Sequence, residues 1–362
     1  MGRRVTKIQL RNIWFQLHKW IGLILAALII PLCLSGSALV WHDALDRIVE
    51  PQRHAVSGNA TLPPPAYAAA AAGVLAPGAR ITQLRLPEAA GDPIVVSASA
   101  AGKPGRINVY LDPPTARVLE VSGSRSGPLM VLHMLHGSLM IAGGTGRIIV
   151  GWLGVAMLVS SISGLWLWWP ISGSWSKGLR WRRHRNLDTN LHHLFGFWIS
   201  LPLFILSLTG AWISFPAFFA PLVGEAPRAP ERASPVVPVT SLADALASAH
   251  ASAPGDVMQI GWPSTARPAW QVTLAAAGTP VEIRVDDATG VATRVKPRPA
   301  SVARWMRQIH DGSDMGLLWQ IVIFLGGLLP AALAVTGIIM WWRARTWRGQ
   351  AKTRRARAQP AE

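Results

Sequence analysis

The sequence predicts a membrane protein with an all-α core of four transmembrane helices, built as two parallel repeats, and with two exported α+β domains. Half of the 362 residues are hydrophobic and only 15% are charged. Together with a mean hydropathy of +0.29, this composition is typical of integral membrane proteins. Two further observations give the arrangement: four long apolar runs without charged residues, and a motif that recurs 174 residues later.

The four apolar runs are Trp20–Trp41, Ile148–Trp169, Leu194–Phe219 and Met315–Trp342. Each is long enough, as a helix, to cross about 30 Å of hydrocarbon. They predict transmembrane helices at 20–41, 147–169, 191–219 and 315–342. The segments between them are a lead-in (1–19), a first exported domain (43–127), an edge helix carrying histidines (128–146), a basic connector (170–190), a second exported domain (221–300), a second edge helix (301–314) and a basic tail (343–362).

Basic residues gather at the helix ends. Residues 1–19, the connector 170–190 and the tail after Trp342 hold 17 of the 35 Lys and Arg residues. By the positive-inside rule, both termini and the connector are expected in the cytoplasm, and the two long loops outside. This distribution, rather than a basic stripe for nucleic acid, explains the net charge of +17. The single cysteine, Cys33, lies within the first apolar run, so no disulfide framework is expected.

The two exported loops show the same order of predicted elements. In the first, an Ala-rich helix at 66–74 precedes strands near 81–86, 94–97, 107–111 and 117–121. In the second, a helix at 242–250 precedes strands near 257–262, 270–274 and 281–285. One helix with a short antiparallel sheet is therefore expected in each loop. The turns Asp112 to Thr115 and Asp286 to Thr289 keep the offset of 174 residues, which supports a duplicated unit.

Four histidines follow the same offset. His18 and His192 begin the first and third apolar runs, and His136 and His310 precede the second and fourth. A lone histidine near a membrane interface is usually an amphipathic side chain with its polar edge in water. Two matched pairs at two depths instead predict a cofactor, and haem b fits because axial imidazoles from different helices can hold it. We expect one haem between His18 and His192, and a second between His136 and His310.

Two glycines and two further histidines accompany these candidates. Gly22 and Gly196 follow His18 and His192 by four residues, so each would leave room for a flat ring one turn deeper. The alternative is that they only permit close helix packing. His133 and His193 are substitute ligands, or interfacial residues that contact a haem propionate.

Two arginines are possible propionate contacts, Arg11 and Arg185, although snorkelling would explain their positions nearly as well. The sequence has no C-x-x-C-H motif for covalent haem attachment. It also has no P-loop, no dinucleotide fingerprint and no nucleophile elbow. Any flavin or nicotinamide would therefore come with an external electron donor.

Several motifs together resemble the PepSY-associated transmembrane helix family of bacterial inner-membrane proteins. They include Leu17-His18-Lys19-Trp20-Ile21-Gly22-Leu23, Leu135-His136-Gly137-Ser138-Leu139, Leu191-His192-His193-Leu194-Phe195-Gly196 and the Ser-Gly or Thr-Gly pairs in the helices. The strand and turn at 109–115 and at 283–289 are similar to the end of a PepSY domain. The resemblance implies a bacterial inner-membrane location, periplasmic PepSY-like domains and a link to iron, because the family includes haem-containing ferric-siderophore reductases.

The expected function is therefore that of a di-haem b electron-transfer protein that reduces a ferric siderophore at the periplasmic side, an oxidoreductase. The expected partners are the lipid bilayer, the ferric chelate and an electron donor that is either flavin- or NAD(P)H-dependent or a quinol. The alternative is a haem-free membrane scaffold whose PepSY-like domains bind a peptide, a protease or a transporter.

Overall fold

A computed structural model describes residues 6–99, 105–123, 126–169, 179–180, 184–225, 234–276, 279–296 and 301–358. The chain forms two compact units. The helical unit comprises Met1–His42, Val131–Pro227 and Ala300–Glu362, and the sheet unit comprises Asp43–Met130 and Arg228–Pro299.

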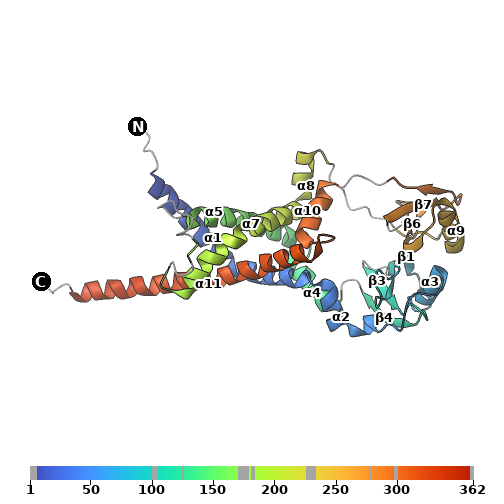
Figure 1. Cartoon of the computed structure of the whole chain (residues 1–362), viewed down its shortest axis with the longest axis horizontal. Coiled ribbons are helices and arrows are strands. Elements are labelled where there is room, and N and C mark those ends of the chain that lie inside the picture. Colours follow the sequence, from blue (N-terminus) through green and yellow to red (C-terminus); the bar gives the residue numbers. More distant parts are fainter. Residues whose placement is uncertain are drawn as a thin grey trace. The chain divides into compact units, whose positions relative to one another are not determined.

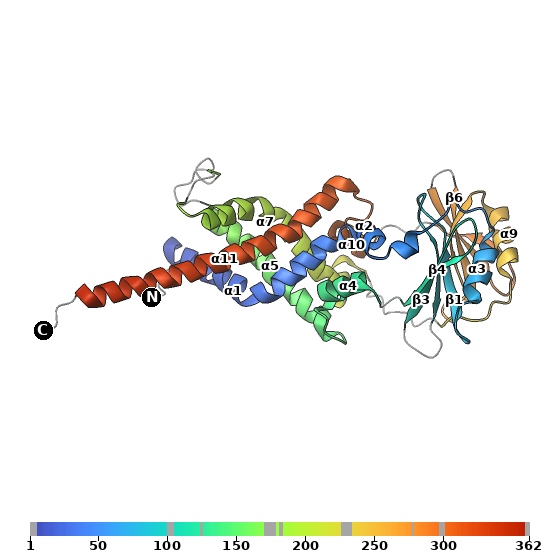
Figure 2. The same ribbon diagram turned by 90° about the horizontal axis from the view of Figure 1, so that it is seen from below.

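Four long helices make up the helical unit: α1 (Lys7–Leu39), α5 (Thr145–Trp168), α7 (Leu187–Ser214) and α11 (Gly316–Ala358). Each is long and apolar enough to cross a membrane, which confirms the predicted multi-pass membrane core. Within the unit, α5 packs along α7, and α1 packs along α11 (Figures 1 and 2). Short helices lie at the helix ends: α4 (Pro128–Ser138), α8 (Pro216–Phe219), η2 (Ala220–Val223) and α10 (Val302–Asp311).

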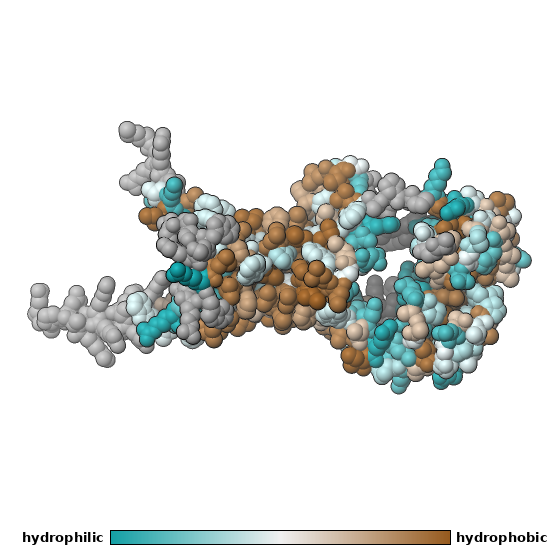
Figure 3. All heavy atoms as spheres, viewed as in Figure 1, coloured by the Kyte–Doolittle hydropathy of each residue, from teal (hydrophilic) through white to brown (hydrophobic). Residues whose placement is uncertain are grey.

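The outer surface of the four long helices is apolar. Figure 3 shows hydrophobic residues covering the visible face of these helices. Large side chains such as Ile24, Trp152 and Leu201 are exposed over more than half of their surface, at 68%, 63% and 66%. A continuous apolar surface of this extent is unfavourable in water and suits contact with lipid.

Two of the long helices extend beyond their predicted spans. Helix α1 begins at Lys7, because Thr6 and Gln9 form a capping box and neither glycine nor proline interrupts the chain before Gly22. Helix α11 continues through the basic tail to Ala358. Of the basic connector 170–190, only 179–180 and 184–190 lie within the described residues.

The sheet unit contains one eight-stranded antiparallel sheet in the order β4-β3-β2-β1-β5-β6-β7-β8. From each loop come four strands: β1 (Arg80–Arg85), β2 (Ile94–Ser99), β3 (Arg106–Leu111) and β4 (Val118–Gly123), then β5 (Asp256–Gly261), β6 (Ala269–Ala276), β7 (Thr279–Asp286) and β8 (Ala292–Arg294). The sequence predicts the strands of each loop but not the seam between them, where Leu84 of β1 pairs with Ile260 of β5. The two loops therefore share one sheet.

One apolar core lies between this sheet and two helices, α3 (Pro64–Ala72) and α9 (Leu242–Ser252). The strands alternate buried and exposed residues, as β7 does, so one face of the sheet supplies the core. Tyr67 of α3, Leu84 of β1 and Val272 of β6 are fully buried in it. The hydroxyl of Tyr67 donates to the carbonyl of Pro113 at 2.5 Å, which satisfies its polar group inside the core.

A buried arginine fastens the start of the sheet unit to its sheet. Arg53 lies in η1 (Pro51–His54), which follows α2 (His42–Val49), and is 8% exposed. Its guanidinium donates to Glu120 of β4 at 2.9 and 3.1 Å and to Asp46 of α2 at 3.0 Å. It also lies over the ring of Tyr110, 5.0 Å from the centroid. Two helical segments and two strands therefore depend on one charge.

Replacing this charge should loosen the edge of the sheet. We expect Arg53→Met to lower the free energy of unfolding of the sheet unit by about 3 kcal/mol, because two partly buried carboxylates lose their counter-ion. Arg47→Met is the matched control: that side chain is 52% exposed and its ion pair with Asp92 should contribute less than about 1 kcal/mol. Hydrogen exchange of the β3 and β4 amides measures the difference. Equal protection in both variants would contradict this role for Arg53.

Candidate functional site

Four histidines meet in two pairs inside the helical unit. The rings of His18 on α1 and His192 on α7 have centroids 6.3 Å apart, with their planes at 86°. Those of His136 on α4 and His310 on α10 are 6.1 Å apart, with their planes at 34°. These are the two pairings that the sequence offset suggests.

The two pairs lie at opposite ends of the long helices. His18 precedes Gly36 on α1 by 18 residues, and Gly36 is the residue against which the ring of His136 packs. At 1.5 Å per residue, the two levels are about 27 Å apart along α1. His192 and Gly210, the glycine beneath His310, have the same spacing on α7.

Each histidine ring packs against a glycine that follows a serine or threonine on a neighbouring helix. A side chain at Gly36 would collide with the ring, one at Gly164 or Gly210 would crowd it, and one at Gly337 would only touch it. An added Cβ would lie 2.5 Å from Cε1 of His136 at Gly36, 3.0 Å from Cε1 of His18 at Gly164, 3.0 Å from Cε1 of His310 at Gly210 and 3.5 Å from Cε1 of His192 at Gly337. The four Ser-Gly or Thr-Gly pairs thus form four seats for imidazole rings.

The same seats hold one nitrogen of every ring. In each case Nδ1 contacts the hydroxyl oxygen of the serine or threonine before the glycine, the backbone carbonyl oxygen three residues before that serine or threonine, or both. The contacts are His18 with the Ser160 carbonyl and Ser163 Oγ, both at 3.1 Å; His136 with the Leu32 carbonyl at 2.8 Å; His192 with Thr336 Oγ1 at 3.0 Å; and His310 with the Leu206 carbonyl at 3.1 Å and Thr209 Oγ1 at 3.0 Å.

These contacts decide which nitrogen carries the proton. A carbonyl oxygen only accepts hydrogen bonds, so Nδ1 of His18, His136 and His310 must donate. At His192 the partner is a hydroxyl, but Thr336 Oγ1 donates its own proton to the carbonyls of Ala332 and Leu333 and therefore accepts from the ring. In all four imidazoles the lone pair is consequently on Nε2, the arrangement of a metal-binding histidine with an oriented second nitrogen.

The separations within both pairs fit two imidazoles on opposite sides of one metal ion. A bond of about 2.0–2.1 Å from nitrogen to the metal, as for zinc, and about 1.1 Å from that nitrogen to the ring centre place two opposed centroids about 6.3 Å apart. The observed values are 6.3 and 6.1 Å. The donor set of two imidazoles in each pair therefore fits a haem iron, which His18 with His192 and His136 with His310 could hold.

The helix surface near three of the histidines is open. An added Cβ at Gly22, one turn after His18, would meet no atom within 4 Å. The same holds for Gly196, one turn after His192, and for Gly137, beside His136. The first two are the positions at which the sequence predicts clearance for a macrocycle.

Burial keeps the second pair neutral. It lowers the pKa of His310 to about 4, with a further lowering from the neighbouring His136 that the hydrogen bond to Leu206 only partly offsets. Burial likewise lowers the pKa of His136 from its usual value. Both imidazoles are therefore unprotonated near neutral pH, which is the form that binds a metal.

The substitute ligands lie beside other histidines. His133 contacts His42 of α2, with ring centroids 5.4 Å apart, and His193 stacks on His184, with centroids 4.7 Å apart and planes at 22°. Reciprocal bonds of 2.7 Å with Asn190 hold the backbone of His184. Neither His42 nor His184 has a counterpart at the 174-residue offset, so no signal in the sequence singles them out.

The two arginines that the sequence suggests as propionate contacts, Arg11 and Arg185, differ from each other in their surroundings. Arg11 donates to the carbonyls of Leu167, at 2.5 Å, and Trp169, at 3.2 Å, at the end of α5. Its positive charge thus satisfies the C-terminal carbonyls of that helix. Arg185 is exposed just before α7.

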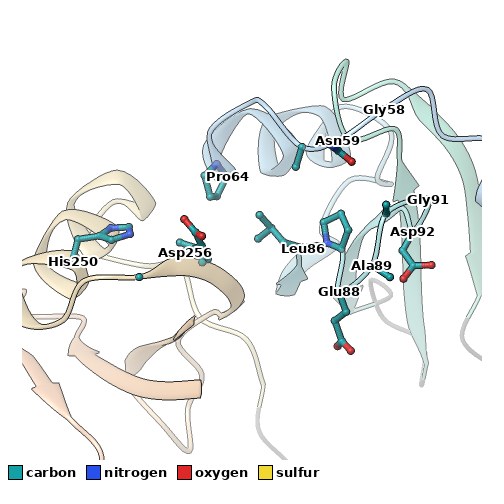
Figure 4. Close-up of a pocket in the computed structure, with 15 residues that line it drawn as sticks. Gly58, Asn59, Pro64, Leu86, Glu88, Ala89, Gly91, Asp92, His250 and Asp256 are labelled. Carbon is teal, nitrogen blue, oxygen red and sulfur yellow. The ribbon is translucent and has the colours of Figure 1, made fainter. Parts of the chain in front are cut away.

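A separate concave site lies in the sheet unit. A pocket of about 520 Å³ opens between the loop after β1 and the start of β5. Figure 4 shows Glu88 and Asp92 on one side and His250 and Asp256 on the other. Asp92 is paired with Arg47 at 2.8 Å.

The family profile described as PepSY-associated TM region matches residues 15–344, which is most of the chain. The chain belongs to the PepSY-associated TM family. The matched range contains the four paired histidines and the four glycines on which their rings rest. No curated protein matches the chain. Membership in the PepSY-associated TM family confirms the resemblance inferred from the sequence and supports a multi-pass membrane protein.

The four glycines differ in how closely the histidine rings approach them, so an added methyl group should have different effects at different glycines. We expect Gly36→Ala to lower the free energy of unfolding by about 1–3 kcal/mol, because the new methyl group displaces the ring of His136 and its bond to Leu32. Gly337→Ala is the matched control, since its methyl group would meet His192 at the ordinary contact distance of 3.5 Å. Thermal unfolding in detergent would compare them. A loss of equal size in both variants would mean that the seats do not position the rings.

Proposed function

We propose that the protein is a di-haem b electron-transfer protein of a bacterial inner membrane, which reduces a ferric siderophore at the periplasmic side. The observation that carries the proposal is the separation within the two histidine pairs. Centroids 6.3 and 6.1 Å apart are close to the value of about 6.3 Å expected for two imidazoles on one metal ion.

In this proposal His18 and His192 hold one haem, and His136 and His310 hold the other. Bound haem supplies one-electron transfer between the ferric and ferrous states of its iron. The chain would supply the orientation, because each Nδ1–H is tied to the helix that carries the glycine seat and the Nε2 lone pair is left for the iron. Gly22 and Gly196 leave the adjacent helix surface open for the macrocycle.

The spacing of the pairs supports transfer across the bilayer. The two levels lie about 27 Å apart along α1, close to the roughly 30 Å thickness of the hydrocarbon core. One cofactor near each face would divide the crossing into two shorter steps. The basic residues of 1–19, the connector 170–190 and the tail favour a cytoplasmic position for that end of the helices.

The electron balance is simple. With haem bound at both pairs, one electron from an external flavin- or NAD(P)H-dependent donor, or from a quinol, would reduce one Fe(III) in the chelate to Fe(II). His18 and His192 would hold the haem on the donor side, and His136 and His310 would hold the haem on the chelate side. Fe(II) binds hard oxygen ligands less tightly and leaves the siderophore more readily. The exported sheet unit would serve to dock the chelate.

Haem content tests the ligand pairs. We expect wild-type protein to carry two haems per chain, and His18→Ala or His192→Ala to lose one of them. The double variant of this pair should lose no more, because both residues hold the same group, whereas His18→Ala combined with His136→Ala should lose both. His250→Ala, on an exposed part of α9, is the control and should keep two. The Soret band and a pyridine haemochrome assay give the stoichiometry.

Two outcomes would overturn this assignment. Protein without a Soret band, after expression with ample haem, would leave the haem-free scaffold as the function. Haem that survives in all four single variants would show that other residues bind it.

The reductase activity has its own test. Dithionite-reduced protein, freed of excess reductant under argon, should be reoxidised by a ferric trihydroxamate, and a ferrous chromogenic chelator should capture about one Fe(II) per electron lost. The His136→Ala and His310→Ala variants, which lack the cofactor at the proposed exit, should react at least about tenfold more slowly, a barrier increase of about 1.4 kcal/mol. A di-haem protein that is not reoxidised by the chelate would be an electron carrier with another acceptor.

A further inference from the structure

A third histidine pair in the helical unit has no part in the proposed electron path. His42 stands at the start of α2, directly after the end of α1, and His133 lies in α4, 91 residues later in the chain. Their ring centroids are 5.4 Å apart and their planes are inclined at 69°. His133 is exposed and His42 is half-buried, so both rings are accessible from outside.

The geometry of this pair differs from that of the two opposed pairs. With the same bond length of about 2.0–2.1 Å from nitrogen to metal, centroids 5.4 Å apart correspond to an angle of about 115–120° at a shared ion. That angle is close to tetrahedral and leaves the other positions on one side of the ion open.

We propose that His42 and His133 form a binding site for a divalent first-row transition-metal ion, with water or a small ligand completing its coordination. Imidazole nitrogen suits Fe(II), Zn(II), Ni(II) and Cu(II), and hard oxygen donors suit them less. In the described part of the chain, no group of three or more His, Cys, Asp or Glu side chains is arranged so that it could hold one metal ion. The site is accordingly a two-ligand, open one, which can both accept and release its ion.

The position of this site suits it to capture the Fe(II) that the proposed reductase would release. His133 and His136 are three residues apart and share one face of α4, so the open site lies one helical turn from the proposed exit haem. An Fe(II) ion that leaves a hard oxygen chelator there would meet two imidazoles, which favour it over the spent chelator. Metal binding by His42 and His133 does not itself require haem, and it can be tested separately.

The pair formed by His184 and His193 has a geometry that does not allow both rings to bind one metal ion. His184 and His193 are stacked with planes only 22° apart and centroids 4.7 Å apart. The nitrogen lone pairs lie in the planes of the rings, so in two nearly parallel stacked rings they run side by side and do not meet at one ion. His184→Ala is therefore a matched control that removes a paired histidine from the same unit.

Zinc provides the test, because it binds imidazole and has no redox chemistry of its own. Untagged protein in detergent is titrated with Zn(II) by calorimetry at pH 7.5. We expect His42→Ala and His133→Ala each to weaken one zinc site by at least about tenfold, since even loss of an outer partner costs a metal site that much. Combining them should weaken it no further, His184→Ala should leave it intact, and His133→Cys should restore it.

The outcomes separate this inference from the proposed function. The Soret band of every variant is recorded alongside the titration, so loss of zinc binding with unchanged haem supports an independent metal site. Zinc affinity that is equal in wild type, His42→Ala and His133→Ala overturns the proposal. Should His133→Ala fail to fold, His42→Ala and His42→Cys carry the same comparison, and loss of zinc binding that cysteine does not restore also counts against it.

Discussion

The helical unit depends on placing polar imidazoles inside an apolar bundle without leaving the donor nitrogen, Nδ1, of any ring unpaired. An unsatisfied donor in such surroundings costs several kcal/mol, and no water is at hand to replace the missing partner. The chain meets this constraint four times in the same way. A glycine lets the ring approach a neighbouring helix, and the turn before the glycine provides the acceptor. A serine or threonine hydroxyl serves at Ser163, Thr209 and Thr336, while at Gly36 the Leu32 carbonyl suffices.

This arrangement connects helix packing with ligand geometry. A small residue at a helix contact usually serves close packing alone, and here the space it leaves holds a side chain from another helix. Because Nδ1 is fixed, the ring cannot rotate, and Nε2 takes a defined direction. Packing and chemistry are thus set by the same few atoms, so a methyl group at Gly36 would alter both.

The sequence predicts much of this, for physical reasons that can be stated. Helices 20 residues long and free of charge have few alternatives, and the offset of 174 residues pairs His18 with His192 and His136 with His310. The sequence does not predict which glycine each histidine ring packs against. The recurring Ser-Gly and Thr-Gly pairs are visible as a pattern, but only the fold shows which ring rests on which glycine. The seam between Leu84 and Ile260 joins strands far apart in the chain, and nothing local specifies it. His42 and His184 lack any repeat partner and could not be selected.

The four seats also explain how the two halves of the helical unit relate to each other. His18 of α1 rests on α5, and His136, which precedes α5, rests on α1. In the other half, His192 of α7 rests on α11, and His310, which precedes α11, rests on α7. Each half is therefore braced at both ends by its own two histidines.

Yet each facing pair takes one ring from each half. When α1 packs with α5, one histidine of each pair is oriented, and when α7 packs with α11, the other one is. Each proposed site is complete only when these two helix pairs come together. A metal centre held between the facing rings would bind only the assembled unit, so its binding free energy would add directly to the association of the two halves. Ligands drawn in this way from both halves would couple the binding of such a centre to assembly. The same arrangement places the two histidine pairs on the boundary between the halves, near opposite ends of the long helices.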